Sequence, residues 1–139
     1  MPETARLTIN PIGYVRSVLK TPDQAAKQGS EGAPDAWLEI SAVFGDGLQG
    51  IRVNQDIVLV TWFHLARRDV LTLHPRHDEE RPLSGVFATR SPDRPNPVAL
   101  HRVTVREITG ATLRVEPLEA LDGTPIVDIK PVLQESEDS

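Results

Sequence analysis

The feature that most constrains the fold is the shortness of the apolar runs, which turn-forming residues separate and which never repeat at helical spacing over any length. Residues 57–63 are almost all β-branched or aromatic, a composition typical of strands. Residues 37–44 place an apolar side chain at every second position, as in a half-buried strand. Several short strands with turns between them predict an all-β fold. We expect a single small β-barrel with long functional loops and at most short helical turns.

Two of the expected strands carry further information about their positions. Residues 57–63 suit a central strand buried on both faces, whereas Pro11 within residues 7–18 indicates an edge strand or a bulge. The polar residues 20–34 and 67–82 indicate long loops. We predict strands at residues 7–18, 37–44, 57–63, 85–89, 98–108, 113–117 and 126–129, turns at Thr109-Gly110 and Asp122-Gly123, and a short helical turn near residues 46–53.

The length of 139 residues fits one domain, for which we expect a core at about residues 7–131 and an acidic C-terminal tail at 132–139. The sequence contains no cysteine, which excludes disulfides and thiolate metal sites. It shows neither a secretory leader nor an apolar stretch near the roughly 18–20 residues that a membrane span requires. We therefore expect a soluble cytoplasmic protein without a membrane partner.

A match to the dinucleotide-binding pattern G-x-G-x-x-G occurs at residues 45–50. That pattern works by placing a pyrophosphate at the N-terminus of a crossover helix of ten or more residues. The next expected strand begins at Ile57, so no crossover helix fits. The segment is interpreted as a turn and not as a Rossmann site.

The charge of the chain is unevenly distributed. The net charge is −5, which by itself argues against a polyanionic partner. Residues 61–106, however, contain eight arginines against five acidic residues, together with all four histidines. A positive middle between acidic ends allows a local anion site, although the same arginines could simply be solvated and paired with nearby acids.

The most informative segment is G-V-F-A-T-R-S-P-D-R-P-N-P at residues 85–97, which we call the arginine loop. Its three prolines restrict φ and remove backbone donors, so the loop should be stiff. Arg90 and Arg94 project from this loop, and Asn96 lies between two prolines. A stiff loop that presents guanidinium groups suits the recognition of carboxylate or phosphate.

This segment resembles the signature G-V-F-A-T-R-S-x-x-R-P-N-P of the TrmO-like family of S-adenosylmethionine-dependent tRNA methyltransferases. Residues 118–131, L-E-A-L-D-G-T-P-I-V-D-I-K-P, resemble a second signature, with Glu119 where the family usually has Asp. Residues 12–15 and 62–69 also resemble family elements. The resemblance covers residues 9–131 in the expected order, and on these motifs the chain is identified as a member of the family.

The resemblance implies a fold, a cofactor and a set of contacts. Members of the family bind S-adenosylmethionine on a β-barrel, without a metal, usually as a homodimer with the cofactor near the subunit interface. The contacts come from the loop after the first strand, the end of the central strand, the arginine loop and the D-G-T-P turn. By motif they fall on Ala26, Lys27, Gln28, His64, Leu65, Arg90, Leu100, Asp122, Gly123, Thr124 and Pro125.

The resemblance also implies a reaction, the N6-methylation of threonylcarbamoyladenosine next to the anticodon of tRNA. Methyl transfer to nitrogen is an in-line displacement, so positioning the acceptor nitrogen should supply most of the rate enhancement. Candidates to orient or deprotonate that nitrogen are Asp128, His64, Asn96 and Asp122, and the sequence does not choose among them. Candidate RNA phosphate contacts are Arg67, Arg68, Arg76, Arg81 and Arg94.

Three other functions remain open at this point. The chain could methylate an acceptor other than tRNA, or it could be a non-catalytic module that binds S-adenosylmethionine. It could also be a metal enzyme built on His74, His77 and Asp78, but no further ligand has suitable spacing, and solvated histidines are the simpler interpretation.

Overall fold

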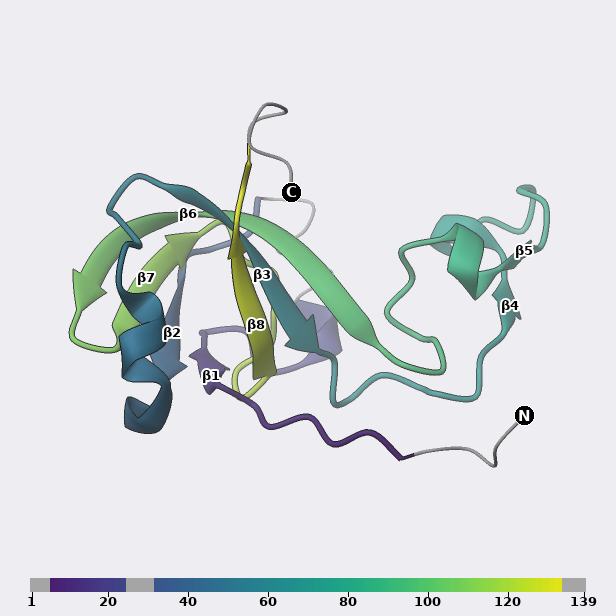
Figure 1. The fold of residues 1–139 in the computed structure, drawn as a ribbon. Coiled ribbons are helices and arrows are strands. Elements are labelled where there is room, and N and C mark those ends of the chain that lie inside the picture. The colour runs from purple at the N-terminus through teal and green to yellow at the C-terminus, as the bar shows by residue number, and fades with distance from the viewer. Residues whose placement is uncertain (1–5, 25–31, 134–139) are drawn as a thin grey trace.

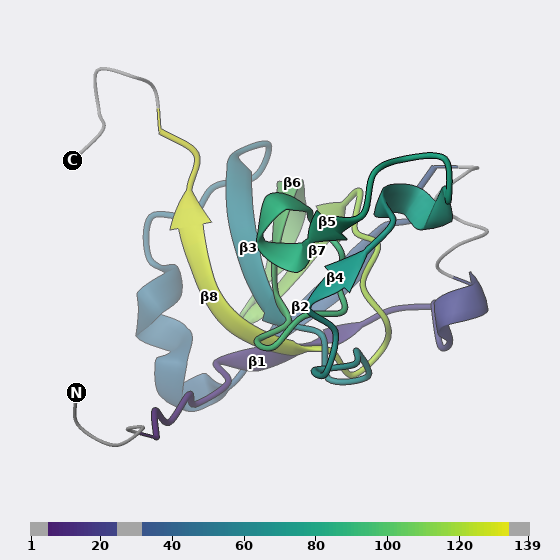
Figure 2. The same ribbon diagram turned by 90° about the vertical axis from the view of Figure 1, so that its right-hand side faces the viewer.

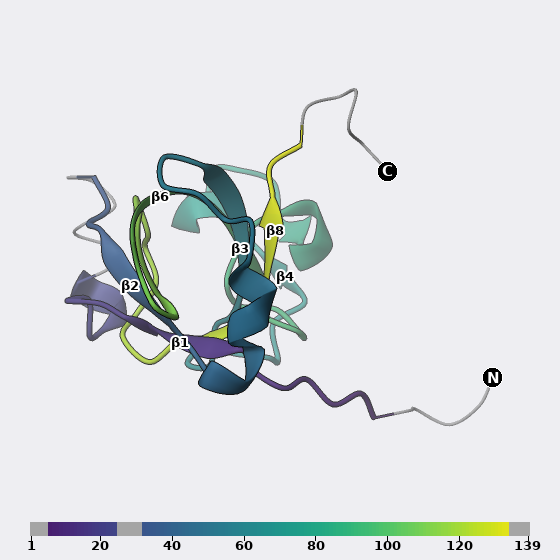
Figure 3. The same ribbon diagram turned by 60° about the vertical axis from the view of Figure 1, so that its left-hand side comes forward.

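Six antiparallel strands close into a barrel in the order β1-β2-β7-β6-β3-β8. The structure is a computed structural model that describes residues 6–24 and 32–133. The ring of strands is visible in Figure 3, with the 3₁₀ turn η1 (Ala42–Leu48) in front of it. This architecture confirms the predicted all-β barrel. The barrel strands are β1 (Gly13–Arg16), β2 (Ala36–Ile40), β3 (Asp56–Trp62), β6 (Val98–Thr109), β7 (Thr112–Glu116) and β8 (Pro125–Pro131).

Residues 63–97, which we call the arm, connect β3 to β6 outside the barrel (Figure 1). The arm contains a two-stranded sheet of β4 (Thr72–Leu73) and β5 (Ser84–Gly85). It also contains two 3₁₀ turns, η2 (Pro75–His77) and η3 (Val86–Ala88). Figure 2 views the molecule from the side on which the arm lies. No helix within the part of the chain that the structure describes has the length and apolar character needed to cross a membrane.

The core lies inside the barrel and follows from the two-residue period of the strands. Every second residue of a strand points inward, so alternating β-branched and leucine side chains from all six strands meet at the centre. Strand β2 passes very close to Gly13, where an added Cβ would lie 2.2 Å from the carbonyl oxygen of Glu39, so only glycine fits. The buried core residues are Val15, Ala36, Leu38, Ile40, Ile57, Leu59, Val103, Val105, Leu113, Val115, Leu118, Ala120 and Ile126.

Two predicted strands are too long. The strand predicted at residues 7–18 pairs only over Gly13–Arg16, and it is paired on both sides, so it is not an edge strand. The strand predicted at residues 37–44 ends at Ile40, because its neighbours end there: Ile40 pairs with Gly13, the first residue of β1, and Glu39 pairs with Thr112, the first residue of β7. Beyond Ile40 the Ser41 amide still donates to the Ile12 carbonyl at 2.8 Å, and the chain then turns into η1.

Two further expectations need correction. Of the strand predicted at residues 85–89, only Gly85 is extended in β5, because the partner strand β4 has just two residues and η3 follows. The run at 57–63 forms the predicted strand between β6 and β8, but its outward side chains Val58 and Trp62 are only half-buried. The hairpin at 98–117, the last strand and the Asp122-Gly123 turn are confirmed.

Candidate functional site

A pocket of about 430 Å³ lies where β3 ends and the segment leading into β8 begins. We call it the end pocket. Its volume is within the range of about 300–1,000 Å³ that is usual for small-molecule sites. Phe63, Leu65 and Leu121 give it apolar walls, and His64 and Thr124 add polar groups. The remaining lining residues are Pro22, Ala66, Pro92, Asp93 and Glu119.

The D-G-T-P turn contributes Thr124 to the end pocket and is fastened to β1 and to the chain that follows it. The Gly123 amide donates to the Val15 carbonyl at 2.7 Å, and Gly123 adopts a φ of +84° that favours glycine. The carboxylate of Asp122 accepts the Ser17 amide at 2.9 Å and lies 2.9 Å from Lys20 Nζ. Lys20 and the Ser17 amide lower the pKa of Asp122. Asp122 therefore holds the turn in place with groups of its own chain.

The opposite wall of the end pocket belongs to the arm, and Arg94 organises it. The Arg94 guanidinium donates to three backbone carbonyls, those of Val86, Thr89 and Ser91, the last at 2.9 Å. Arg94 was a candidate RNA contact, but these bonds direct its guanidinium into the loop. A planar guanidinium can serve several carbonyls at once, which a lysine cannot.

Arg68 joins the two ends of the arm. Its Nε donates to the Pro95 carbonyl at 2.6 Å, and its Nη2 donates to Asn96 Oδ1 at 3.1 Å. The guanidinium also lies 5.0 Å from the ring centre of Trp62. Asn96 is thus oriented by Arg68, and both residues have structural partners.

A broad groove of about 1100 Å³, which we call the basic groove, lies on the other side of the arginine loop. Pro92 and Asp93 line both the end pocket and the basic groove, so they form a ridge between the two. Arg90 lines the groove and is absent from the lining of the end pocket. The basic residues of the groove are Arg67, Arg76, Arg81, Arg90, His74 and His77.

The arginines of the basic groove differ in how far acids neutralise them. Arg67 makes a two-point contact with Asp69, at 3.1 Å for each oxygen, which lowers the pKa of Asp69. Arg81 lies 3.7 Å from Asp78. Within residues 6–24 and 32–133, Arg76 and Arg90 have neither an ion pair nor a side-chain hydrogen bond. Their charges are the ones that remain available to an anion.

Two predicted site residues, Leu100 and Asp128, lie on the outside of the barrel. Val103 and Val105 of β6 point inward, so Leu100 points outward, where its exposed fraction is 54%. Val60 pairs with Leu100 on one side and with Asp128 on the other, and we call these three residues the outer row. A bulge at Val127 changes the alternation of β8 and thereby turns Asp128 outward, next to Lys130 at 3.5 Å.

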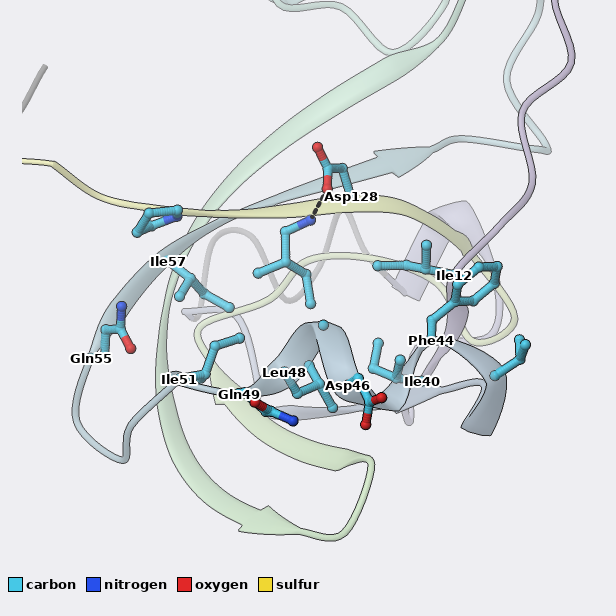
Figure 4. A pocket seen from close by; sticks show the side chains of 15 residues that line it. Ile12, Ile40, Phe44, Asp46, Leu48, Gln49, Ile51, Gln55, Ile57 and Asp128 are labelled. Carbon is cyan, nitrogen blue, oxygen red and sulfur yellow. Dashed lines mark hydrogen bonds between the residues drawn. The ribbon is translucent and has the colours of Figure 1, made fainter. Parts of the chain in front are cut away.

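A third hollow, of about 630 Å³, lies between η1 and β8, at the opposite end of the β3–β8 pair from the end pocket. Figure 4 shows its apolar side chains pointing toward one another while the carboxylate of Asp128 turns away from them. One oxygen of this carboxylate accepts the Ile129 amide at 2.9 Å. None of the predicted cofactor contacts that fall within residues 6–24 and 32–133 lines this hollow.

Sequence reasoning did not single out His101, although it lies below the end pocket. His101 Nε2 is 2.8 Å from Oγ1 of the buried Thr61. Its ring packs edge-on against Phe63, with 5.6 Å between the ring centres, and Phe63 lines the end pocket. Burial lowers the pKa of His101 to about 4, so the imidazole is neutral near pH 7. An inward position on a barrel strand was the signal that could have identified it.

The structure divides the predicted cofactor contacts into three places. His64, Leu65 and Thr124 line the end pocket, and Asp122, Gly123 and Pro125 flank Thr124 in its turn. Arg90 faces the basic groove, and Leu100 belongs to the outer row. The predicted contacts Ala26, Lys27 and Gln28 lie outside the described residues.

Three comparisons place the chain among known proteins. The family model of the tRNA-methyltransferase O N-terminal domain matches residues 14–138. A protein of Methanothermobacter thermautotrophicus described as "Probable S-adenosyl-L-methionine-binding protein" is 41% identical over 129 residues, covering 93% of this chain and 92% of that protein. The S-adenosyl-L-methionine-binding protein of Archaeoglobus fulgidus is 40% identical over 125 residues, covering 89% and 88%.

Solved structures of longer proteins match as well. The crystal structure of TrmO from Pseudomonas aeruginosa is 27% identical with a TM-score of 0.70, and the match covers 97% of this chain and 60% of that one. This chain therefore spans about three-fifths of the TrmO chain that it matches.

Proposed function

Because the chain belongs to the tRNA-methyltransferase O N-terminal domain family, we propose that it is an S-adenosylmethionine-dependent methyltransferase whose acceptor is an adenosine of tRNA. One observation carries the proposal. A pocket of small-molecule size and a groove with available arginines adjoin the same ridge, Pro92-Asp93. This arrangement places a small-molecule site and a polyanion site next to each other, as methyl transfer from a cofactor to a nucleic acid needs.

The cofactor is S-adenosylmethionine. Relatives that are about 40% identical over most of their length are named for binding this molecule. The end pocket fits this molecule in volume and chemistry. Phe63, Leu65 and Leu121 offer apolar surface to an adenine ring and to the methylene groups. His64 and Thr124, together with the neighbouring turn, offer polar groups to the amino-acid and ribose ends.

The RNA side of the proposal rests on the basic groove. RNA affinity comes largely from phosphate contacts, and these need cations that acids of the protein do not neutralise. Arg76 and Arg90 meet this condition, whereas Arg67 is paired with Asp69 and Arg94 with the carbonyls of its loop. The local charge of the groove thus favours a polyanion despite the net charge of −5.

In the proposed reaction, bound S-adenosylmethionine supplies an electrophilic methyl group. The chain holds the acceptor at the ridge, and its apolar walls exclude water from the reacting atoms. His64 lines the end pocket. Among the candidate residues, we therefore propose His64 as the base that accepts the proton lost by the acceptor nitrogen. Asn96 is held by Arg68, and Asp128 lies in the outer row, so neither reaches the end pocket within one chain.

We also propose a homodimer in which the outer row of one protomer completes the site of the other. Leu100 and the end pocket belong to different surfaces of the barrel, yet the family resemblance assigns both to one cofactor. A second copy that docks on the outward face of β6 and β3 would bring them together. Val98 and Leu100 on this face are exposed apolar side chains, which favours a protein partner.

Mass spectrometry of tRNA nucleosides tests the proposed function. The full chain is incubated with methyl-labelled S-adenosylmethionine and with unmethylated tRNA that carries threonylcarbamoyladenosine. We expect the label in the N6-methylated form of this nucleoside. A parallel reaction with chelator should give the same result.

The same experiment separates the other functions. If the label appears on an added small molecule or on protein while the tRNA stays unlabelled, the acceptor is that molecule or protein and not tRNA. Cofactor binding in calorimetry without any transfer would indicate a non-catalytic module. Absence of cofactor binding by folded protein would overturn the whole proposal.

A further inference from the structure

Phe87 lines none of the three hollows and does not belong to the core cluster. It lies at the centre of η3 with an exposed fraction of 83%. The next three residues, Ala88, Thr89 and Arg90, all line the basic groove. A large aromatic side chain is therefore displayed to solvent at the edge of a groove that carries available positive charge.

The backbone on either side of Phe87 is held firmly. Val86 is 1% exposed, and its amide donates to the Leu71 carbonyl at 2.9 Å. Arg94 donates to the carbonyls of Val86 and Thr89, which flank the turn. The amide and the hydroxyl of Thr89 also donate to the Val86 carbonyl, both at 3.0 Å. The backbone that carries Phe87 is thus held in one conformation, which reduces the entropy lost when a partner covers the ring.

The chemistry of the surroundings identifies the class of partner. Proteins recognise single-stranded RNA by stacking its unpaired bases on aromatic side chains while arginines contact the phosphates. Phe87 supplies the aromatic face, and Arg90, three residues later, supplies a guanidinium that pairs with no acid among the described residues. We propose that Phe87 is the stacking platform for an unpaired base of the RNA acceptor. This inference rests on the proposed function, because it assumes that the acceptor is RNA.

Three variants of Phe87 separate stacking from other roles. Phe87→Leu keeps an apolar side chain but removes the π face, Phe87→Trp keeps the π face, and Phe87→Ala removes both. The probe is a short RNA hairpin with an unpaired loop that contains the fluorescent base 2-aminopurine. Leu83→Ala, at an exposed apolar residue of the same arm, is the matched control.

We expect Phe87→Leu and Phe87→Ala to weaken RNA binding roughly five- to hundredfold, the loss typical of one stacked base. They should also abolish the quenching of 2-aminopurine that stacking produces. Phe87→Trp and Leu83→Ala should bind like the wild type. Affinity for S-adenosylmethionine and the mass from light scattering should stay unchanged in all four variants.

Each other outcome has one meaning. Wild-type affinity of Phe87→Leu for the hairpin would overturn the stacking role while leaving the RNA acceptor intact. Dissociation of Phe87→Leu to monomers would assign the ring to a subunit interface instead. If the wild type binds S-adenosylmethionine but not the hairpin, the RNA acceptor itself fails, and this result does not depend on any variant.

Discussion

At the scale of single residues, His101 shows how the barrel changes the properties of a side chain. Its ring lies inside the strand layer, is bonded to Thr61 and packs on Phe63. Burial keeps it neutral by lowering its pKa from about 6.5 to about 4. In the unfolded chain the imidazole regains its usual pKa, so the two states bind protons differently in this pH range.

We predict that His101 makes the protein less stable as the pH falls from about 6.5 toward 4. In this window the unfolded state gains a proton that the folded state does not bind, so the free energy of unfolding decreases. His101→Gln should flatten this part of the pH dependence, measured as urea midpoints at pH 7 and pH 4.5. His64→Gln, at an exposed histidine, is the control. Equal pH dependence of wild type and His101→Gln would contradict the assignment.

At the scale of elements, the arm is held by arginine side chains more than by a sheet. Its β4–β5 sheet pairs only two residues from each strand. Arg94 bonds to three carbonyls of the arginine loop, and Arg68 connects the loop to the chain that leaves β3. The rigidity of the ridge between the end pocket and the basic groove therefore depends on the hydrogen bonds of these two guanidinium groups.

We predict that Arg94→Lys destabilises the protein whereas Arg90→Lys does not. A lysine cannot reach three carbonyls in one plane, and a charge-assisted hydrogen bond contributes about 1.5–3 kcal/mol. Urea unfolding should show a loss of that order for Arg94→Lys, with faster amide exchange at Thr89. Arg90→Lys, in the same loop and exposed, is the matched control. Equal stabilities for both variants would show that Arg94 does not hold the loop.

A substitution of Arg90 distinguishes two possible partners of its guanidinium, the cofactor and the RNA. If the partner's Leu100 and this Arg90 share a cofactor, Arg90→Ala should weaken S-adenosylmethionine binding about ten- to hundredfold, the loss of one charge-assisted bond. Calorimetry measures this directly. If cofactor affinity is unchanged while RNA affinity falls, Arg90 serves the basic groove alone.

At the scale of the whole molecule, the barrel separates residues that one cofactor would have to contact. The end pocket belongs to the open end beyond β3, and the outer row belongs to the outward face of β6, β3 and β8. Within one protomer Leu100 does not line the end pocket, because it points outward from β6. This separation is the reason for proposing a shared site in a homodimer.

We predict that Leu100→Glu yields a folded monomer with reduced cofactor affinity. The substitution places a charge on the outward apolar face and leaves the end pocket of its own chain untouched, so loss of cofactor affinity together with dissociation would show that the partner completes the site. Light scattering and calorimetry measure the two effects. Val43→Glu, at an exposed residue of η1, is the control and should remain dimeric. A wild type that is monomeric with full cofactor affinity would contradict the shared site.

The sequence by itself determined the barrel and the hairpin, and it predicted that the arginine loop and the D-G-T-P turn belong to the site. Alternation of apolar residues reports which side of a strand is buried, and proline or glycine reports where the chain must turn, so both are visible locally. The family motifs likewise identified His64, Leu65 and Thr124, which the structure brings together in the end pocket. The predicted domain limits at 7–131 and 132–139 stay a prediction.

Only the tertiary structure decided where the strands end and where each functional side chain points. β2 stops at Ile40 because its neighbours stop, and this is a property of three segments far apart in sequence. Asp128 faces outward because one bulged residue shifts the alternation of β8. Arg94 turns into its loop because three carbonyls converge on it. Strand partners and bulges depend on segments far apart in the sequence, so no local pattern records them. The carbonyls around Arg94 lie within its own loop, but their convergence depends on the backbone conformation of that loop, which the residue types alone do not give.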